Sequence, residues 1–160
     1  MIPRHLTRKL VESASRFPVV TVTGPRQSGK TTLVRSVFKK HAYASLESPD
    51  ERAFATEDPR GFLEQFDQPV ILDEIQRVPD LFSYIQVRVD EKDRNGQYIL
   101  TGSQNFLLLQ GVSQSLAGRC AVLHLLPLSI SELERRPPAE LARLGGPDLK
   151  RPTTPSSRLE

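Results

Sequence analysis

Residues 19–38 read VVTVTGPRQSGKTTLVRSVF, and this stretch decides the fold. Its first five residues are β-branched and follow a proline, which is typical of a buried strand that ends at Gly24. Apolar residues recur at helical spacing over residues 30–39, which predicts a helix of about ten residues. Between strand and helix, Gly24–Thr31 satisfies the pattern G-x-x-x-x-G-K-[ST]. A strand that leads through this pattern into a helix is the context of a phosphate-binding loop.

This loop predicts a nucleotide site. Glycines let backbone N–H groups turn inward around phosphate oxygens, and the helix N-terminus adds a partial positive charge. We expect Lys30 to bridge the β- and γ-phosphates and the Thr31 hydroxyl to ligate Mg²⁺. Arg26 is explained equally well as an exposed loop arginine. The predicted nucleotide-binding residues are Gly24, Pro25, Arg26, Gln27, Ser28, Gly29, Lys30, Thr31 and Thr32.

A second pattern, PVILDE at residues 69–74, is an apolar run that ends in two acids. It predicts another buried strand, and carboxylates at such a place are costly unless they are paired or near a metal. We expect Asp73 to hold the hydration shell of Mg²⁺ together with Thr31. Glu74 is expected to orient and deprotonate the water that attacks the γ-phosphate. Two adjacent acids favour water over a substrate hydroxyl as the nucleophile.

The rest of the chain alternates predicted strands with predicted helices. Further strands are expected at 42–46, 97–103 and 121–126, and helices at 5–17, 50–57, 60–66, 80–92 and 129–136, with a short helix or turn over 105–110. Such alternation argues for a parallel sheet covered on both faces. The predicted fold class is α/β: three αβα layers around a mostly parallel sheet of five strands.

Composition sets limits on the class of protein. With 160 residues, 38% of them hydrophobic and 26% charged, the chain has the balance of one globular domain. A single cysteine, Cys120, excludes a disulfide scaffold, and no apolar run reaches the roughly 18–20 residues that span a bilayer. We therefore expect a cytoplasmic protein with no membrane partner. The net charge of +3 is only a weak indication of nucleic-acid contact.

Proline is concentrated at the C-terminal end of the chain. Five of the 13 prolines occupy positions 137, 138, 147, 152 and 155. The last stretch also lacks aromatic and β-branched aliphatic residues, so it cannot build a core. We predict a folded core over residues 1–136 and a disordered Pro/Gly-rich tail over residues 137–160.

The motifs in their order resemble one class of proteins, the AAA+ P-loop ATPases. Within that class the chain is most similar to a prokaryotic AAA-like family that carries a second, C-terminal domain of unknown role. The resembling stretches are IPR (2–4), TGPRQSGKTTL (23–33), SLESPDERAFATEDPRGFL (45–63), PVILDEIQRVPDLFSYIQ (69–86), YILTGSQNF (98–106) and SLAGRCAVLHLLPLSISEL (115–133). The resemblance implies the fold of a P-loop NTPase, with ATP and Mg²⁺ as ligands. It covers the N-terminal ATPase core only, so we expect the lid and the C-terminal domain to be absent.

Further roles follow from this resemblance alone. The end of the strand YILTGS is where the class keeps a polar sensor of the γ-phosphate, so Ser103 or Thr101 is the candidate. Arg119 resembles the arginine finger of the class, which acts on a neighbouring subunit's site and implies a homo-oligomer. A structural ion pair is an equal alternative for Arg119. Gln76 matches the family pattern, but no role follows for it.

Three functions fit these residues to different degrees. The first is an Mg²⁺-dependent ATPase that hydrolyses ATP through Glu74, with weak activity in this chain alone. The alternative is a nucleotide-binding switch with little turnover, in which ATP occupancy controls a partner. A small P-loop kinase ranks low, because a kinase needs an acceptor pocket and a lid that carries arginines.

Overall fold

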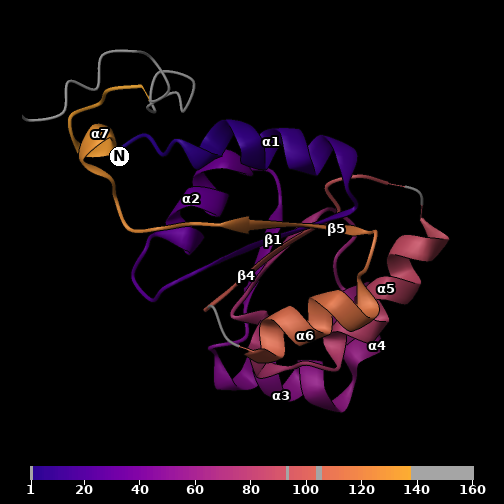
Figure 1. The fold of residues 1–160 in the computed structure, drawn as a ribbon. Coiled ribbons are helices and arrows are strands. Elements are labelled where there is room, and N and C mark those ends of the chain that lie inside the picture. The colour runs from indigo at the N-terminus through magenta and orange to yellow at the C-terminus, as the bar shows by residue number, and fades with distance from the viewer. Residues whose placement is uncertain (1, 93, 104–105, 138–160) are drawn as a thin grey trace, which may run out of the picture.

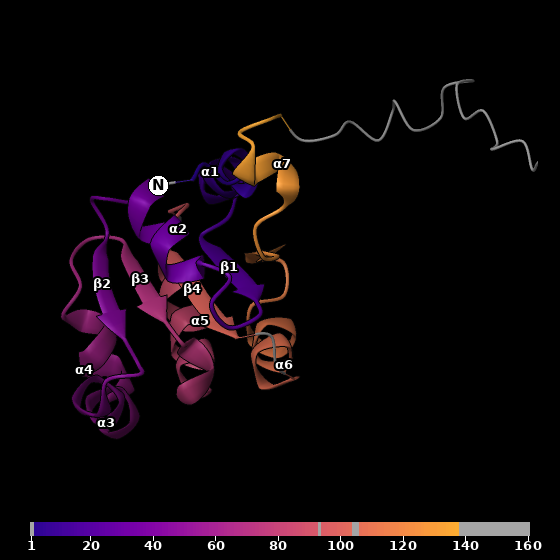
Figure 2. The same cartoon turned by 90° about the vertical axis from the view of Figure 1, so that its left-hand side faces the viewer.

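The computed structural model describes residues 2–92, 94–103 and 106–137, and its centre is one sheet of five parallel strands. The strands are β1 (Val19–Gly24), β2 (Ala42–Ser45), β3 (Val70–Asp73), β4 (Tyr98–Ser103) and β5 (Cys120–His124). Their order across the sheet is β2-β3-β4-β1-β5, and Figure 2 shows the first four side by side in this sequence. Every pairing is parallel. The predicted α/β class and five-stranded sheet are confirmed, and the sheet is wholly parallel rather than mostly so.

Helices cover both faces of the sheet, as Figure 1 shows. They are α1 (Leu6–Arg16), α2 (Lys30–Val37), α3 (Pro49–Glu57), α4 (Pro59–Glu64), α5 (Leu81–Glu91), α6 (Phe106–Ser115) and α7 (Ile130–Leu133), with a 3₁₀ turn η1 (Ile75–Arg77). The sheet residues Val20 and Ile99 pack with α1 and α2 in one apolar cluster. Val70 and Leu100 pack with α3, α4, α5 and α6 in the other. The interior strands β1, β3 and β4 are buried on both faces, whereas the edge strands β2 and β5 are partly exposed.

The register of the strands brings three chain segments to one edge of the sheet. Gly24, the last residue of β1, pairs with Ser103, the last residue of β4. Leu72 of β3 pairs with Leu100 of β4, so Asp73 lies beside this same edge. The phosphate-loop sequence, the acidic pair and the end of YILTGS therefore meet at the carboxyl end of the sheet, where α/β folds bind ligands.

Two elements differ from the predicted ranges. The helix expected at 129–136 begins behind the Ser129 cap as predicted but ends at Leu133, since Arg135 adopts a positive φ of 55° and Pro137 follows. The short helix or turn expected at 105–110 is a helix of ten residues, α6. Residues 138–160 of the predicted tail lie outside the described residues. Within the described part of the chain, no helix is long and apolar enough to cross a membrane.

The N-terminal segment is held against α7, and Figure 1 shows the two side by side. The link is the carboxylate of Glu132, which is only 6% exposed. It accepts hydrogen bonds from the Arg4 guanidinium at 3.0 Å, from the His5 amide at 2.9 Å and from the Ser129 amide at 2.9 Å. The Ser129 hydroxyl in turn accepts from the Glu132 amide, which completes a capping box. Two segments more than 120 residues apart are thereby joined through one buried acid.

These contacts decide the ionisation of Glu132. Burial alone would raise the pKa of its carboxyl, but the Ser129 and His5 amides and the Arg4 guanidinium together lower that pKa from 4.5 to about 2. A carboxyl whose pKa is lower in the folded state than in the unfolded state stabilises the fold above the unfolded pKa. The contribution is thus complete above pH 4.5 and is lost as the pH falls toward 2.

We expect Glu132→Gln to lower the free energy of unfolding at pH 7 by up to about 3 kcal/mol, since one pKa unit corresponds to about 1.4 kcal/mol. The difference from wild type should shrink as the pH falls from 4.5 to 2. Urea unfolding followed by circular dichroism at pH 7, 5, 4 and 3 measures it. Glu12→Gln is the control, because Glu12 pairs with Arg16 on the exposed face of α1. A Glu132→Gln difference that is independent of pH would contradict the expected ionisation.

Candidate nucleotide-binding site

The loop between β1 and α2 has the backbone shape of an anion cradle. Gly24 has a φ of 152°, and a Cβ at this position would overlap the carbonyl oxygen of Leu125. Gly29 has a φ of 88° and forms the N-cap of α2, and Gln27 adopts a positive φ of 61°. Successive amides in such conformations form a concave nest for an anion. The glycines of the motif are therefore required by backbone geometry and close approach.

Lys30 begins α2 and its side chain folds back over the loop. The ammonium Nζ donates to the carbonyl oxygens of Gly24, at 3.1 Å, and Pro25, at 2.8 Å. The residue is 6% exposed, so a full positive charge is buried against neutral acceptors. A buried cation gains strongly from an anionic partner, and phosphate oxygens at the loop would provide one.

Asp73 ends β3 and faces the N-terminus of α2. The Thr31 hydroxyl lies 3.1 and 3.0 Å from the two carboxylate oxygens of Asp73. The Tyr43 hydroxyl donates to Asp73 at 3.0 Å, and the Thr101 hydroxyl donates to its other oxygen. Asp73 is 7% exposed, and hydroxyl donors on three sides stabilise its charge there. Thr31 and Asp73, which the sequence predicted as metal ligands, are in direct contact.

Glu74 follows Asp73 with a left-handed backbone, at a φ of 57°. This conformation is uncommon outside glycine. Gln76, for which the sequence indicated no role, donates a hydrogen bond from Nε2 to the Glu74 carboxylate. Glu74 and Lys30 line one hollow together, so the structure brings them to the same site.

The two candidate sensor residues have different surroundings. The hydroxyl of Thr101 is committed to Asp73. The hydroxyl of Ser103 is buried and has no hydrogen-bond partner among the described residues. Because Ser103 pairs with Gly24 at the start of the loop, its free hydroxyl lies beside the phosphate cradle.

Two hollows flank the loop. One, of about 540 Å³, is polar and lies on the side of the acidic pair; its lining residues are Arg26, Gln27, Gly29, Lys30, Thr31, Thr32, Glu47, Glu74 and Arg77. The other, of about 380 Å³, lies on the side of the N-terminus. Its wall includes four apolar residues that sequence reasoning missed: Ile2, Pro3, Pro127 and Leu128. The stretch IPR was noted only as a resemblance, and no sequence pattern places it beside residues 127–128.

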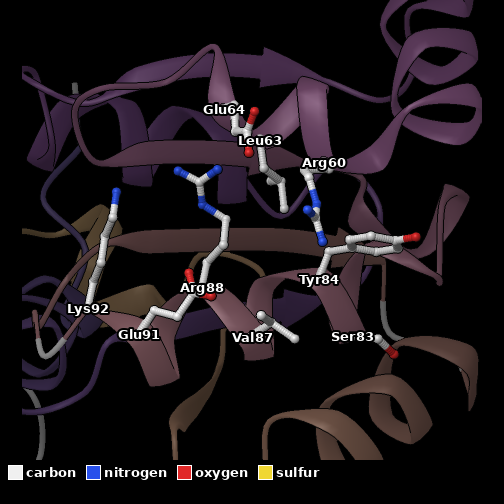
Figure 3. Close-up of a pocket in the computed structure, with 9 residues that line it drawn as sticks. All are labelled: Arg60, Leu63, Glu64, Ser83, Tyr84, Val87, Arg88, Glu91 and Lys92. Carbon is white, nitrogen blue, oxygen red and sulfur yellow. The ribbon is translucent and has the colours of Figure 1, made fainter.

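A third hollow, of about 620 Å³, lies between α4 and α5 and contains none of the predicted nucleotide residues. Figure 3 shows Arg60, Arg88 and Lys92 there with Glu64 and Glu91, arranged around Tyr84 and Val87. Charges of both signs therefore line it. The candidate nucleotide site differs from this hollow in its chemistry, since it combines Lys30, Thr31 and Glu74 at the glycine-containing loop.

Arg119 is not part of this site within its own chain. It directly precedes Cys120, which pairs with Val19 at the start of β1, whereas the phosphate loop follows the end of β1. That separation is about 16 Å along the strand. The Arg119 guanidinium pairs with Asp90 of α5, and its Nη2 lies 2.9 Å from Oδ2. The ion pair that the sequence left as an alternative is thus present in the single chain.

Cys120 follows Arg119 at the amino-terminal edge of the sheet and has the properties of a packing residue. Burial raises the pKa of its thiol to about 11, against the lowering effect of hydrogen bonds with Thr21. The Thr21 hydroxyl lies 3.2 Å from Sγ. A thiol held in the neutral form is a poor nucleophile.

Comparison with known sequences agrees with this geometry. A family model described as an AAA domain matches residues 16–134. Uncharacterized proteins of Mycobacterium bovis and Mycobacterium tuberculosis are each 34% identical over 131 residues. The match covers 81% of this chain and 30% of each relative, so the chain spans about 30% of the length of these curated relatives.

Solved structures share the fold at low sequence identity. A Walker-type ATPase of Pyrococcus abyssi has a TM-score of 0.59 at 21% identity, over 84% of this chain and 57% of that protein. A RuvB variant of Thermotoga maritima has a TM-score of 0.51 at 17% identity, over 81% and 46%. The P-loop NTPase domain of a sigma-54 transport activator from Escherichia coli has 0.50 at 16%, over 76% and 92%. Because the family match extends from the end of α1 into the turn after α7, and the phosphate loop follows β1, an interior strand of the sheet, the chain belongs to the AAA+ class of P-loop ATPase domains.

Proposed function

We propose that this chain binds ATP with Mg²⁺ at the carboxyl edge of the sheet and hydrolyses it to ADP and phosphate. The observation that carries the proposal is the convergence of Lys30, Thr31, Asp73 and Glu74, from α2, β3 and the turn that follows β3. A buried ammonium, a hydroxyl, a buried carboxylate and a second carboxylate at one concave loop match the needs of phosphoryl transfer to water.

The phosphates are held by the backbone of residues 24–32 and by Lys30. The positive φ values of Gln27 and Gly29 give the loop the backbone conformation of an anion nest, and the N-terminus of α2 favours negative charge. Lys30 exchanges its two carbonyl acceptors for β- and γ-phosphate oxygens at little conformational cost, because its side chain already lies over the loop. The nucleoside fits the apolar hollow made by Ile2, Pro3, Pro127 and Leu128.

The donor chemistry at Thr31 and Asp73 suits Mg²⁺, which prefers oxygen ligands and keeps several of its waters. Thr31 would contribute its hydroxyl directly, and Asp73 would accept hydrogen bonds from the water ligands. Tyr43 and Thr101 keep the Asp73 carboxylate oriented toward Thr31. The ion neutralises charge on the β- and γ-phosphate oxygens when it is bound.

Hydrolysis requires that Glu74 take a proton from the attacking water. The water oxygen bonds to the γ-phosphorus as the bond to the β-phosphate oxygen breaks, and the water proton passes to the Glu74 carboxylate. The Ser103 hydroxyl is free to donate to the γ-phosphate or the water. In the structure the Glu74 carboxylate accepts a hydrogen bond from the Gln76 side-chain amide. We propose that this hydrogen bond belongs to the resting state and breaks when Glu74 contacts the attacking water.

Lys30→Ala should weaken binding of a fluorescent ATP analogue in the presence of Mg²⁺ by at least about tenfold, since it removes a charge-assisted contact worth roughly 1.5–3 kcal/mol. An anisotropy titration of wild type and variant measures the two dissociation constants. Lys39→Ala, which removes an exposed lysine in the turn after α2, serves as the control. Equal affinity of wild type and Lys30→Ala would overturn the phosphate-loop assignment.

Glu74→Gln should leave nucleotide affinity within about threefold of wild type and reduce phosphate release by roughly 10²–10⁴, the contribution of a general base. A coupled phosphate assay at high protein concentration measures the rate, with the exposed Glu57→Gln as control.

The alternative function is a nucleotide-binding switch without significant turnover. The distance of Arg119 from the phosphate loop of its own chain favours this alternative. Phosphate release at the background rate by both wild type and Glu74→Gln would support it.

We further propose that Arg119 acts on the site of a neighbouring copy in a homo-oligomer. Its position at the amino end of β5 excludes a role at its own phosphate loop. In the single chain the guanidinium is held by Asp90 near the surface, where a second subunit can reach it. An arginine supplied across an interface stabilises the charge of the transition state.

A mixing experiment tests this arrangement. Arg119→Ala has an intact site but no arginine to supply, and Glu74→Gln supplies the arginine but cannot hydrolyse. The rate of phosphate release by each variant alone should be lower than that of wild type by a factor on the order of 10² or more. An equimolar mixture of the two should regain a measurable fraction of the wild-type rate. A mixture of Arg119→Ala with the Glu74→Gln/Arg119→Ala double variant is the matched control. Failure of the first mixture to exceed this control would contradict action across an interface.

A further inference from the structure

Arg4 connects the phosphate loop to the C-terminal end of the described chain. Its side chain is 10% exposed and has three acceptors. Nη1 donates to the carbonyl oxygen of Ser28 at 2.7 Å, Nη2 donates to the carbonyl oxygen of Leu126 at 2.6 Å, and Nε donates to Glu132 at 3.0 Å. One planar guanidinium thus binds the loop, the segment after β5 and α7.

The contact with Ser28 controls an amide that faces the phosphates. The carbonyl of Ser28 and the N–H of Gly29 belong to one planar trans peptide, in which the two groups point in opposite directions. By holding the carbonyl on the outer side of the loop, Arg4 directs the Gly29 N–H toward the inner, concave side. The neighbouring residues Gln27 and Gly29 both have positive φ, so this peptide would otherwise have several orientations available.

The contacts with α7 hold the guanidinium in place. The Glu132 carboxylate is anchored by the His5 and Ser129 amides, and it is oriented before it meets Arg4. Arginine has a planar fork of donors, and a lysine ammonium at the same position cannot serve three separated acceptors with the same geometry. The Ser28 contact and the Glu132 contact therefore stabilise each other through the one side chain.

We propose that Arg4 is a positioning residue that sets the Ser28–Gly29 peptide for phosphate binding, and that through Glu132 it couples phosphate occupancy of the loop to the order of residues 126–133. This inference rests on the proposed nucleotide binding. Coupling of this kind is reciprocal: whatever order nucleotide imposes on α7, order of α7 favours nucleotide to the same extent. A segment or partner that contacts α7 would therefore affect nucleotide binding at the loop.

The first arm of the test is nucleotide affinity at equilibrium. We expect Arg4→Ala to raise the dissociation constant of a fluorescent ADP analogue by about tenfold, the usual effect of one hydrogen bond from a charged donor. Arg4→Lys should raise it by less, and Glu132→Gln by roughly two- to threefold. The effects of Arg4→Ala and Glu132→Gln should not add in the double variant, because both act through one contact. Arg16→Ala, which removes an exposed arginine of α1, should change nothing.

The second arm separates coupling from mere stabilisation of the fold. In wild type, saturating ADP should slow hydrogen–deuterium exchange of the amides in residues 130–133, and in Arg4→Lys and Arg4→Ala this slowing should be lost or at least halved. Measurements are made where thermal unfolding shows each variant to be more than nine-tenths folded. If Arg4→Ala does not fold, Arg4→Lys and Glu132→Gln carry both arms.

The outcomes are distinguishable from failure of the proposed function. If wild type does not bind nucleotide, or binds it as well as Lys30→Ala does, the proposed function fails and the inference fails with it. If wild type and Lys30→Ala differ as expected but the Arg4 and Glu132 variants bind like wild type, the inference alone is overturned. If the Arg4 variants bind nucleotide more weakly but ADP does not change hydrogen–deuterium exchange of α7 in wild type, the coupling is overturned.

Discussion

The site depends on one constraint, the parallel pairing of β4 with β1 on one side and with β3 on the other. Because the strands run in one direction, their carboxyl ends meet at one edge, and polar residues that follow separate apolar runs are brought together. Asp73 is the clearest result of this. It is buried, and it is tolerable there because hydroxyls from α2, β2 and β4 donate to it. Each of these elements is held in place by the same sheet.

The same constraint separates Arg119 from the loop. A residue that precedes a parallel strand lies at the amino edge, one strand length from residues that follow the neighbouring strand. The candidate phosphate ligands thus lie at one edge of the sheet, and the Arg119 guanidinium, paired with Asp90, lies near the other. Under the proposed function, a second copy would have to supply this arginine, and the rate of hydrolysis would then depend on assembly.

Contacts between the two ends of the described chain add a second layer to the site. Arg4 and Glu132 come from segments that are adjacent neither in sequence nor in the sheet, yet the Arg4 guanidinium donates both to Glu132 and to the Ser28 carbonyl of the loop. The apolar hollow beside them is also made from both ends, by Ile2, Pro3, Pro127 and Leu128. The contacts of Arg4 connect the phosphate loop to α7, and the coupling proposed above rests on them.

The sequence by itself determined the elements and their class. Short β-branched and apolar runs located the strands, helical spacing located the helices, and the loop pattern with PVILDE named Lys30, Thr31, Asp73 and Glu74, because those signals lie within short windows of the chain. It could not choose between Thr101 and Ser103, assign Gln76, or find Arg4 and the apolar hollow. Thr101, Arg4 and the apolar hollow depend on contacts between residues tens to more than a hundred positions apart. The contact of Gln76 with Glu74 is local, but it depends on the backbone geometry of the turn after β3, which the residue types do not specify. Only the tertiary structure decided that Thr101 holds Asp73 and that Arg119 is remote from the phosphate loop, since both follow from strand register and packing rather than from residue type.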